Sequence, residues 1–246
     1  MQDKKILAVL TTESDDSVLN SFITHFGAGT NIDMTLCCVK DDSSPACEGE
    51  HLSGRVTTTC TKKSIPLKVA EIHADAATAM RSRAPFADLV VVEKEVLRKL
   101  ALRDELPRES GAILALPSRF SEITNVILLF DGTASGLRGI KEFFQVFARH
   151  TNKMEVTLLC IESDTYAFRK EEEMQLVEYI RRHSTEVGVL KVAPPLTDRH
   201  LRAVSHKAAP VVTGDLEYLI GLRGSAIGFK PFYDDTATLF IPSANR

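Results

Sequence analysis

Ile6-Leu7-Ala8-Val9-Leu10 and Val126-Ile127-Leu128-Leu129-Phe130 are two short, continuously apolar stretches that decide how this chain folds. Two further pairs of apolar runs follow them at nearly the same offset, 34–39 with 156–161 and 112–118 with 237–243. An internal repeat of this kind fixes the architecture before any other feature is interpreted. We therefore expect two similar domains in one chain, covering residues 1–121 and 122–246.

Strands and helices alternate along each half of the sequence. Helices of the second half include those expected over 169–186, 198–206 and 218–220. The strands expected in the first half are 5–10, 34–39, 67–72, 88–92 and 112–116; those in the second half are 126–130, 156–161, 189–192, 210–213 and 238–241. Strands that are apolar at nearly every position, with helices between them, indicate a parallel sheet covered on both faces. The sequence thus predicts two tandem, doubly wound, Rossmann-like α/β domains.

Functional groups in such sheets lie beyond the carboxyl ends of the strands. This rule places candidate sites at residues 11–17 and 93–110 of the first half, and at 131–137 and 213–236 of the second.

Composition restricts the classes of partner. The chain has 246 residues, 44% of them apolar, with a net charge of −3. No long basic run is present, so we expect no nucleic-acid partner. No apolar run approaches the ~18 residues that span a membrane, so we expect no membrane partner and a cytoplasmic location. The five cysteines and seven histidines show no metal-ligand spacing, and no metal site is expected.

Several short motifs resemble the universal stress protein family. Asp75-Ala-Ala-Thr-Ala-Met80, the strand at 87–92 and the closing Ile113–Pro117 are similar to a domain of that family. In the second half, Phe130-Asp131-Gly132-Thr133 resembles the family's opening turn, in which an aspartate contacts adenine. The resemblance covers nearly the whole chain. It implies a tandem universal stress protein with the adenine nucleotide alpha-hydrolase-like fold, acting in stress response or signalling without catalysis.

ATP-binding members of the family carry the motif G-x2-G-x9-G-S/T after the fourth strand. The first half has Glu93-Lys94-Glu95 at that place and Thr11-Thr12 where an aspartate is expected, so we expect no family-type ATP binding there. In the second half the resemblance makes six residues nucleotide-binding candidates: Asp131, Thr133, Gly214, Gly221, Gly224 and Ser225. However, Asp234-Asp235 stand where the motif should end, and their carboxylates would repel phosphate. We therefore interpret the nucleotide-binding loops as degenerate.

Two other functions stay open. One is a sensor whose second half binds ATP, AMP or another small ligand, so an adenine nucleotide is the candidate cofactor. The other, less favoured, is a nucleotide hydrolase with a metal held by Asp234-Asp235. A D-x-D-G-T phosphotransferase is rejected because Leu129 stands where the nucleophilic carboxylate should be. No catalytic residue is assigned.

The family resemblance also implies how the halves associate. In family members the last strand, with its terminal proline, pairs with the equivalent strand of a partner. The matching segments here are 112–117 and 238–242, which predict an intramolecular pseudo-dimer and cover otherwise open sheet edges. A homodimer and an unidentified protein partner are further alternatives.

Overall fold

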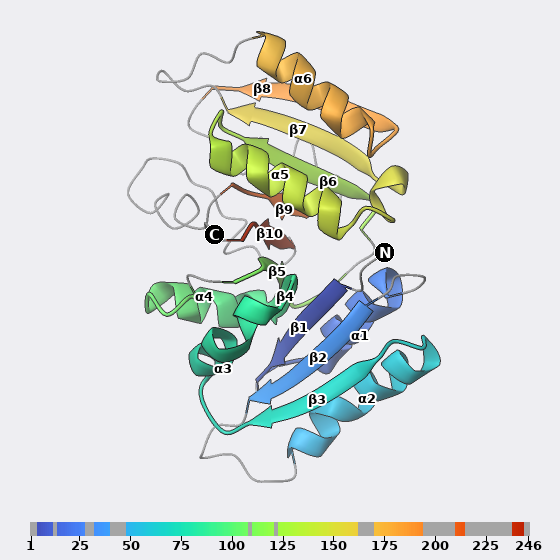
Figure 1. Ribbon diagram of the computed structural model, residues 1–246, viewed down its shortest axis with the longest axis vertical. Coiled ribbons are helices and arrows are strands. Elements are labelled where there is room, and N and C mark those ends of the chain that lie inside the picture. Colours follow the sequence, from blue (N-terminus) through green and yellow to red (C-terminus); the bar gives the residue numbers. More distant parts are fainter. Residues whose placement is uncertain are drawn as a thin grey trace. The chain divides into compact units, whose positions relative to one another are not determined.

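The computed structural model describes residues 4–11, 14–27, 32–39, 48–107, 110–120, 123–161, 170–193, 210–214 and 238–243. By its internal contacts the chain forms two compact units, Met1–Ser121 with Ser243–Arg246, and Glu122–Pro242. Each unit is a mixed α/β structure built on a parallel sheet (Figure 1). The predicted fold class of parallel sheets with helices is thereby confirmed.

The sheet of the first unit has the strand order β3-β2-β1-β4-β5. Its strands are β1 (Lys4–Leu10), β2 (Ile32–Val39), β3 (Leu67–Ile72), β4 (Leu89–Glu93) and β5 (Ala112–Leu116). The register pairs Val9 with Cys37 on one side and with Val92 on the other. Thr11, which follows β1, therefore lies near Glu93, the last residue of β4.

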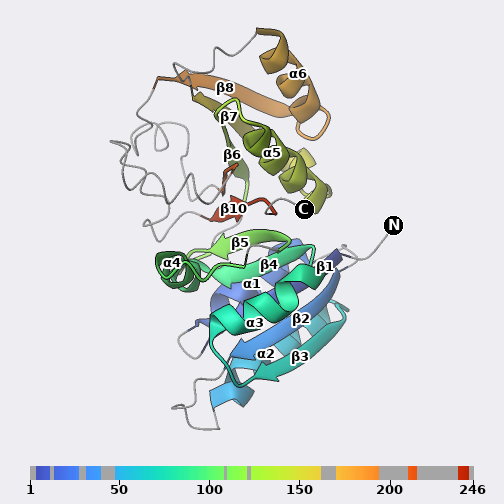
Figure 2. The ribbon, with the colours of Figure 1, turned by 60° about the vertical axis from the view of Figure 1, so that its left-hand side comes forward.

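Helices cover both faces of this first sheet. They are α1 (Asp16–Phe26), α2 (Glu48–Lys62), α3 (Ala76–Arg83), the 3-10 turn η1 (Ala84–Phe86) and α4 (Lys94–Leu102). Helix α1 packs on α2, and α3 contacts α4 and lies across β1 and β2 (Figure 2). Asp75 begins α3, because its side chain accepts a hydrogen bond from the Thr78 N–H at 2.7 Å.

The sheet of the second unit has the corresponding order, β8-β7-β6-β9-β10. Its strands are β6 (Asn125–Phe130), β7 (Glu155–Ile161), β8 (Glu186–Val192), β9 (Val211–Val212) and β10 (Leu239–Ile241). The helical elements described are α5 (Ala134–Val146), η2 (Thr151–Lys153) and α6 (Lys170–Arg181). Aromatic side chains fill the core between α5 and β10, where the rings of Phe143 and Phe240 meet edge to face at 5.3 Å.

Two boundaries in the second unit differ from the prediction. The helix expected over 169–186 ends at Arg181, and the strand expected over 189–192 begins at Glu186. Ser184 accounts for the change, because its buried hydroxyl donates to the Met154 carbonyl at 2.7 Å and fixes a turn between the two elements. The helices expected over 198–206 and 218–220 lie outside the described residues.

In the part of the chain that the structure describes, no helix has both the length and the apolar character needed to cross a membrane.

Candidate functional site

The turn after β6 is tightly organised around one carboxylate oxygen. Asp131 Oδ1 accepts hydrogen bonds from the Thr133 backbone N–H at 3.0 Å and from the Thr133 hydroxyl at 2.7 Å. The same hydroxyl accepts a hydrogen bond from the Gly136 N–H at 3.0 Å, which caps the start of α5. Gly132 allows the turn because its φ of 83° lies in the region that favours glycine. Asp131 Oδ2 makes no hydrogen bond to any described residue.

Gly214, a predicted nucleotide-binding residue, follows Thr213 at the carboxyl end of β9. A Cβ atom at Gly214 would lie 2.5 Å from the Gly136 backbone nitrogen, closer than real Cβ contacts allow. The carbonyl of Gly214 also accepts a hydrogen bond from the Ser135 hydroxyl. Packing of α5 against the end of β9 is therefore sufficient to require glycine at this position, whether or not a ligand approaches it.

Three of the six predicted residues are brought to one place. Asp131, Thr133 and Gly214 all contact the first turn of α5, at the carboxyl ends of the neighbouring strands β6 and β9. Gly221, Gly224 and Ser225 lie outside the described residues, as do Asp234 and Asp235.

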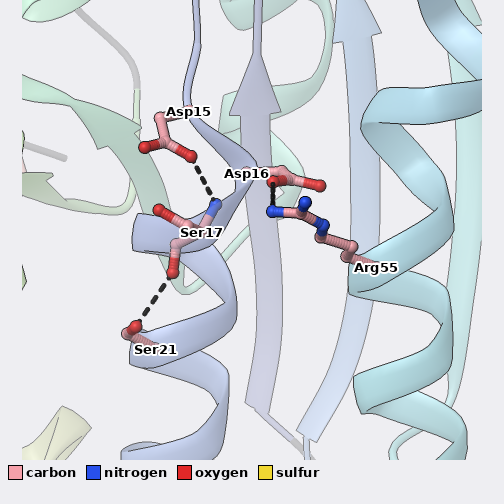
Figure 3. Close-up of polar contacts among 5 residues, drawn as sticks. All are labelled: Asp15, Asp16, Ser17, Ser21 and Arg55. Carbon is pink, nitrogen blue, oxygen red and sulfur yellow. Dashed lines mark hydrogen bonds and ion pairs between the residues drawn. The ribbon is translucent and has the colours of Figure 1, made fainter.

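The corresponding turn in the first unit is held differently. After β1, the Thr11 N–H donates to the Ser14 hydroxyl at 3.0 Å. Asp15 begins α1 by accepting a hydrogen bond from the Ser17 N–H at 2.8 Å (Figure 3). This hydrogen bonding lowers the pKa of Asp15. Burial raises the pKa of the neighbouring Asp16, which Arg55 of α2 partly offsets through an ion pair at 3.4 Å (Figure 3).

Glu93 places a carboxyl group beside this turn. Burial raises the pKa of Glu93, and the charge of Asp15 adds to the rise. The nearby Ser14 hydroxyl and Asp15 backbone N–H oppose this rise. Oε1 of Glu93 is buried and accepts no hydrogen bond from the described residues. The end of β4 therefore directs an acidic side chain of the protein toward the N-terminal segment of α1.

A cavity of about 210 Å³ lies on the other face of the first sheet, at the same carboxyl ends. Thr11 and Val39 line it from the strands, and Lys99 and Arg103 from the region of α4. Its volume is below the roughly 300–1,000 Å³ of typical pockets for drug-sized ligands. The predicted site region 93–110 includes both cations, but no motif marked them. Their four-residue spacing puts them on one helix face, and it is the feature of the sequence that predicts that they lie together.

The described part of the chain contains scattered His, Cys, Asp and Glu side chains, and its His183 is closely stacked on an aromatic ring. No group of three or more His, Cys, Asp or Glu side chains among the described residues could hold a metal ion. His183 stacks on Phe144, with ring centroids 4.7 Å apart and planes 16° apart. Burial and the charge of Arg182 lower the pKa of His183. These contacts give His183 a packing role.

No protein-family model and no curated protein matches this chain. Among solved structures it is similar to a universal stress protein from Archaeoglobus fulgidus DSM 4304, with a TM-score of 0.65 and 10% identity, covering 99% of this chain and 97% of that one. It also aligns with the cytoplasmic domain of a prokaryotic cation chloride cotransporter over 100% of this chain and 98% of that one, at 9% identity and a TM-score of 0.49. The first likeness shows that the chain has a universal-stress-protein-like fold.

Proposed function

We propose that this chain is a tandem universal stress protein that acts in stress response or signalling by binding, without catalysis. The shared fold supports the family assignment. The functional argument rests on the position of Glu93, because this part of the chain differs from the phosphate-binding loop of ATP-binding family members.

Glu93 stands where the phosphate-binding loop of those members begins. Free backbone N–H groups at a helix start normally attract the negative charge of a phosphate. Here the Asp15 N–H and the Ser14 hydroxyl lie close enough to the Glu93 carboxyl group to lower its pKa. A phosphate in that place would compete with the carboxylate for these two groups and would be repelled by its charge. The first unit is therefore a degenerate site that does not bind nucleotide in the family manner.

The second unit supports a second candidate function, an adenine-nucleotide sensor. Asp131 occupies the family's adenine-contacting position, and its Oδ2 is left without a hydrogen bond from the described residues. Against this, the carboxylates of Asp234 and Asp235 replace the end of the phosphate motif. Each would cost on the order of 1–3 kcal/mol of binding free energy if it lay near a phosphate. We therefore favour the binding protein with two degenerate loops.

Thermal unfolding with and without millimolar Mg-ATP, ADP and AMP tests both candidates, because a ligand that binds only the native state raises the midpoint. We expect no shift with any of the three. A rise that Asp131→Ala removes would establish the nucleotide sensor and overturn the degenerate second site.

Asp15→Ala is the matched control for this experiment. It removes a comparable hydrogen bond, in which a backbone N–H donates to an aspartate carboxylate at 2.8 Å against 3.0 Å, but in the first unit. If a nucleotide-induced shift disappears with Asp15→Ala and persists with Asp131→Ala, the first unit binds the nucleotide and the argument from Glu93 fails.

Absence of catalysis needs its own assay. Incubation with Mg²⁺ and each of the common nucleotides should release no phosphate above the rate without protein. Turnover that Asp234→Ala abolishes would instead establish a metal-dependent nucleotide hydrolase. Three statements stay predictions from the sequence: pairing through segments 112–117 and 238–242, a homodimer, and a cytoplasmic location. Light scattering in solution would decide the oligomeric state.

A further inference from the structure

The geometry points to a ligand site in the first unit, a cationic cleft that binds a small organic anion carrying a flat ring. The cleft is lined by Lys5, Asp33, Lys68, Arg83 and Phe86, together with neighbouring apolar and hydroxyl-bearing residues. It lies at the amino-terminal ends of the strands, opposite the Thr11 and Glu93 end. It therefore goes beyond the proposed function and does not depend on it.

The fold creates this cleft from three strands and the end of one helix. Lys5, Asp33 and Lys68 are the second residues of β1, β2 and β3. Lys5 is opposite Asp33 in the register, and Lys68 is opposite Thr35, two residues further along β2, so all of these side chains share one sheet face. Helix α3 lies over β1 and β2 on that face and contributes Arg83 at its end (Figure 2). The resulting cavity of about 480 Å³ has the size of a small-molecule pocket, which is typically about 300–1,000 Å³.

The cleft holds more positive than negative charge. Lys5, Lys68 and Arg83 line it against the single carboxylate of Asp33. None of these four side chains makes an ion pair within the described part of the chain. The nearby Asp88 carboxylate accepts a hydrogen bond from the Lys5 backbone N–H at 2.9 Å. In a chain whose net charge is −3, this local excess of cations favours a ligand with phosphate or other anionic oxygens, which guanidinium and ammonium groups recognise.

Phe86 adds a second kind of recognition. It belongs to η1, three residues after Arg83, and 76% of its surface is exposed. Its ring lines the same cavity as Arg83. A flat ring of a ligand can stack on an exposed aromatic face or on a guanidinium plane. The cleft therefore combines anion recognition with ring stacking, which defines the ligand class.

Phenyl phosphate is a minimal probe of that class, and inorganic phosphate is the same anion without the ring. Titrating each into the ¹⁵N-labelled full chain and following amide NMR signals should give saturable shifts at Lys68, Arg83 and Phe86. Phenyl phosphate should bind several-fold more tightly than inorganic phosphate, and both should weaken as salt is raised. The double variant Lys68→Gln with Arg83→Gln should weaken phenyl phosphate binding about tenfold.

Lys141→Gln is the control for loss of a positive charge outside the cleft, because Lys141 is an exposed cation on α5 of the second unit. It should leave the affinity unchanged. Phe86→Ala should abolish the difference between the two probes while leaving inorganic phosphate binding intact. The proposal is overturned if the shifts do not saturate, if they map to residues outside the cleft, if the two probes bind wild type equally, or if the double variant binds like Lys141→Gln.

Discussion

Replacing Gly139 by alanine should destabilise the second unit, although the same change usually strengthens a helix. Gly139 lies inside α5, where alanine in place of glycine normally contributes up to about 1 kcal/mol. Here the added Cβ would lie 2.5 Å from the Thr213 carbonyl oxygen and 3.4 Å from Pro242 Cγ. Because the nearest atom belongs to the backbone, α5 or the end of β9 must move. Overpacking of this kind costs roughly 1–3 kcal/mol.

The net effect follows from the difference of these two terms. We expect Gly139→Ala to lower the free energy of unfolding of the second unit by about 1–2 kcal/mol. For a unit of this size that corresponds to a fall of roughly 3–8 °C in the midpoint of thermal unfolding.

Gly54 supplies the matched control. It lies inside α2 of the first unit, and a Cβ there would meet no atom within 4 Å. Gly54→Ala should therefore raise stability by about 0.5–1 kcal/mol. Scanning calorimetry of the wild type and both variants measures the two shifts directly. Equal stabilisation by both substitutions would refute the close packing of α5 on β9.

Three further predictions concern single side chains. Glu93→Gln should stabilise the protein at pH 7 by about 1 kcal/mol, because a neutral amide avoids an incompletely hydrogen-bonded buried carboxylate. The raised pKa of Glu93 means that the wild type loses stability as pH rises from 4.5 through the pKa of Glu93 in the folded protein. The stabilisation by Glu93→Gln should therefore shrink in unfolding experiments near pH 4.5. The lowered pKa of His183 predicts the opposite pH dependence, in which stability falls as pH drops below 6.5. His183→Phe should remove this contribution to the pH dependence of unfolding midpoints measured between pH 7 and pH 5. Thr133→Ala should cost about 1 kcal/mol in urea unfolding by removing the cap of α5, and Thr133→Ser should cost far less; equal losses would contradict a capping role.

Continuous apolar runs made most of the parallel sheets predictable. Ile6–Leu10 and Val126–Phe130 are buried strands at the predicted places. The start of β8 was missed because this edge strand is exposed along most of its length. The segment Glu186-Val187-Gly188 therefore lacks the continuous apolar run that marks a buried strand.

The candidate site was only partly predictable, because its key features depend on register and packing. The sequence showed that Glu93 replaces a glycine-rich loop. It did not show that the carboxyl group lies close to Ser14 and Asp15, which requires β1 and β4 to be neighbours. The sequence made Gly214 a nucleotide-binding candidate, and the close approach of α5 is sufficient to require glycine there without a ligand. Lys5, Lys68 and Arg83 are far apart in the chain, and only the sheet register and the position of α3 bring them into one cleft.

The Glu93 carboxyl group is covalently attached to the chain, which favours it over a free phosphate that would occupy the same place. A group held on a strand meets its binding partners at an effective concentration on the order of millimolar or more, without diffusing to them. A phosphate in solution would have to displace this tethered anion from its place beside Ser14 and Asp15 before gaining any contact of its own. Lowering the pH would neutralise the competitor without detaching it. Recovering an open anion site in the first unit would therefore require the side chain itself to be removed.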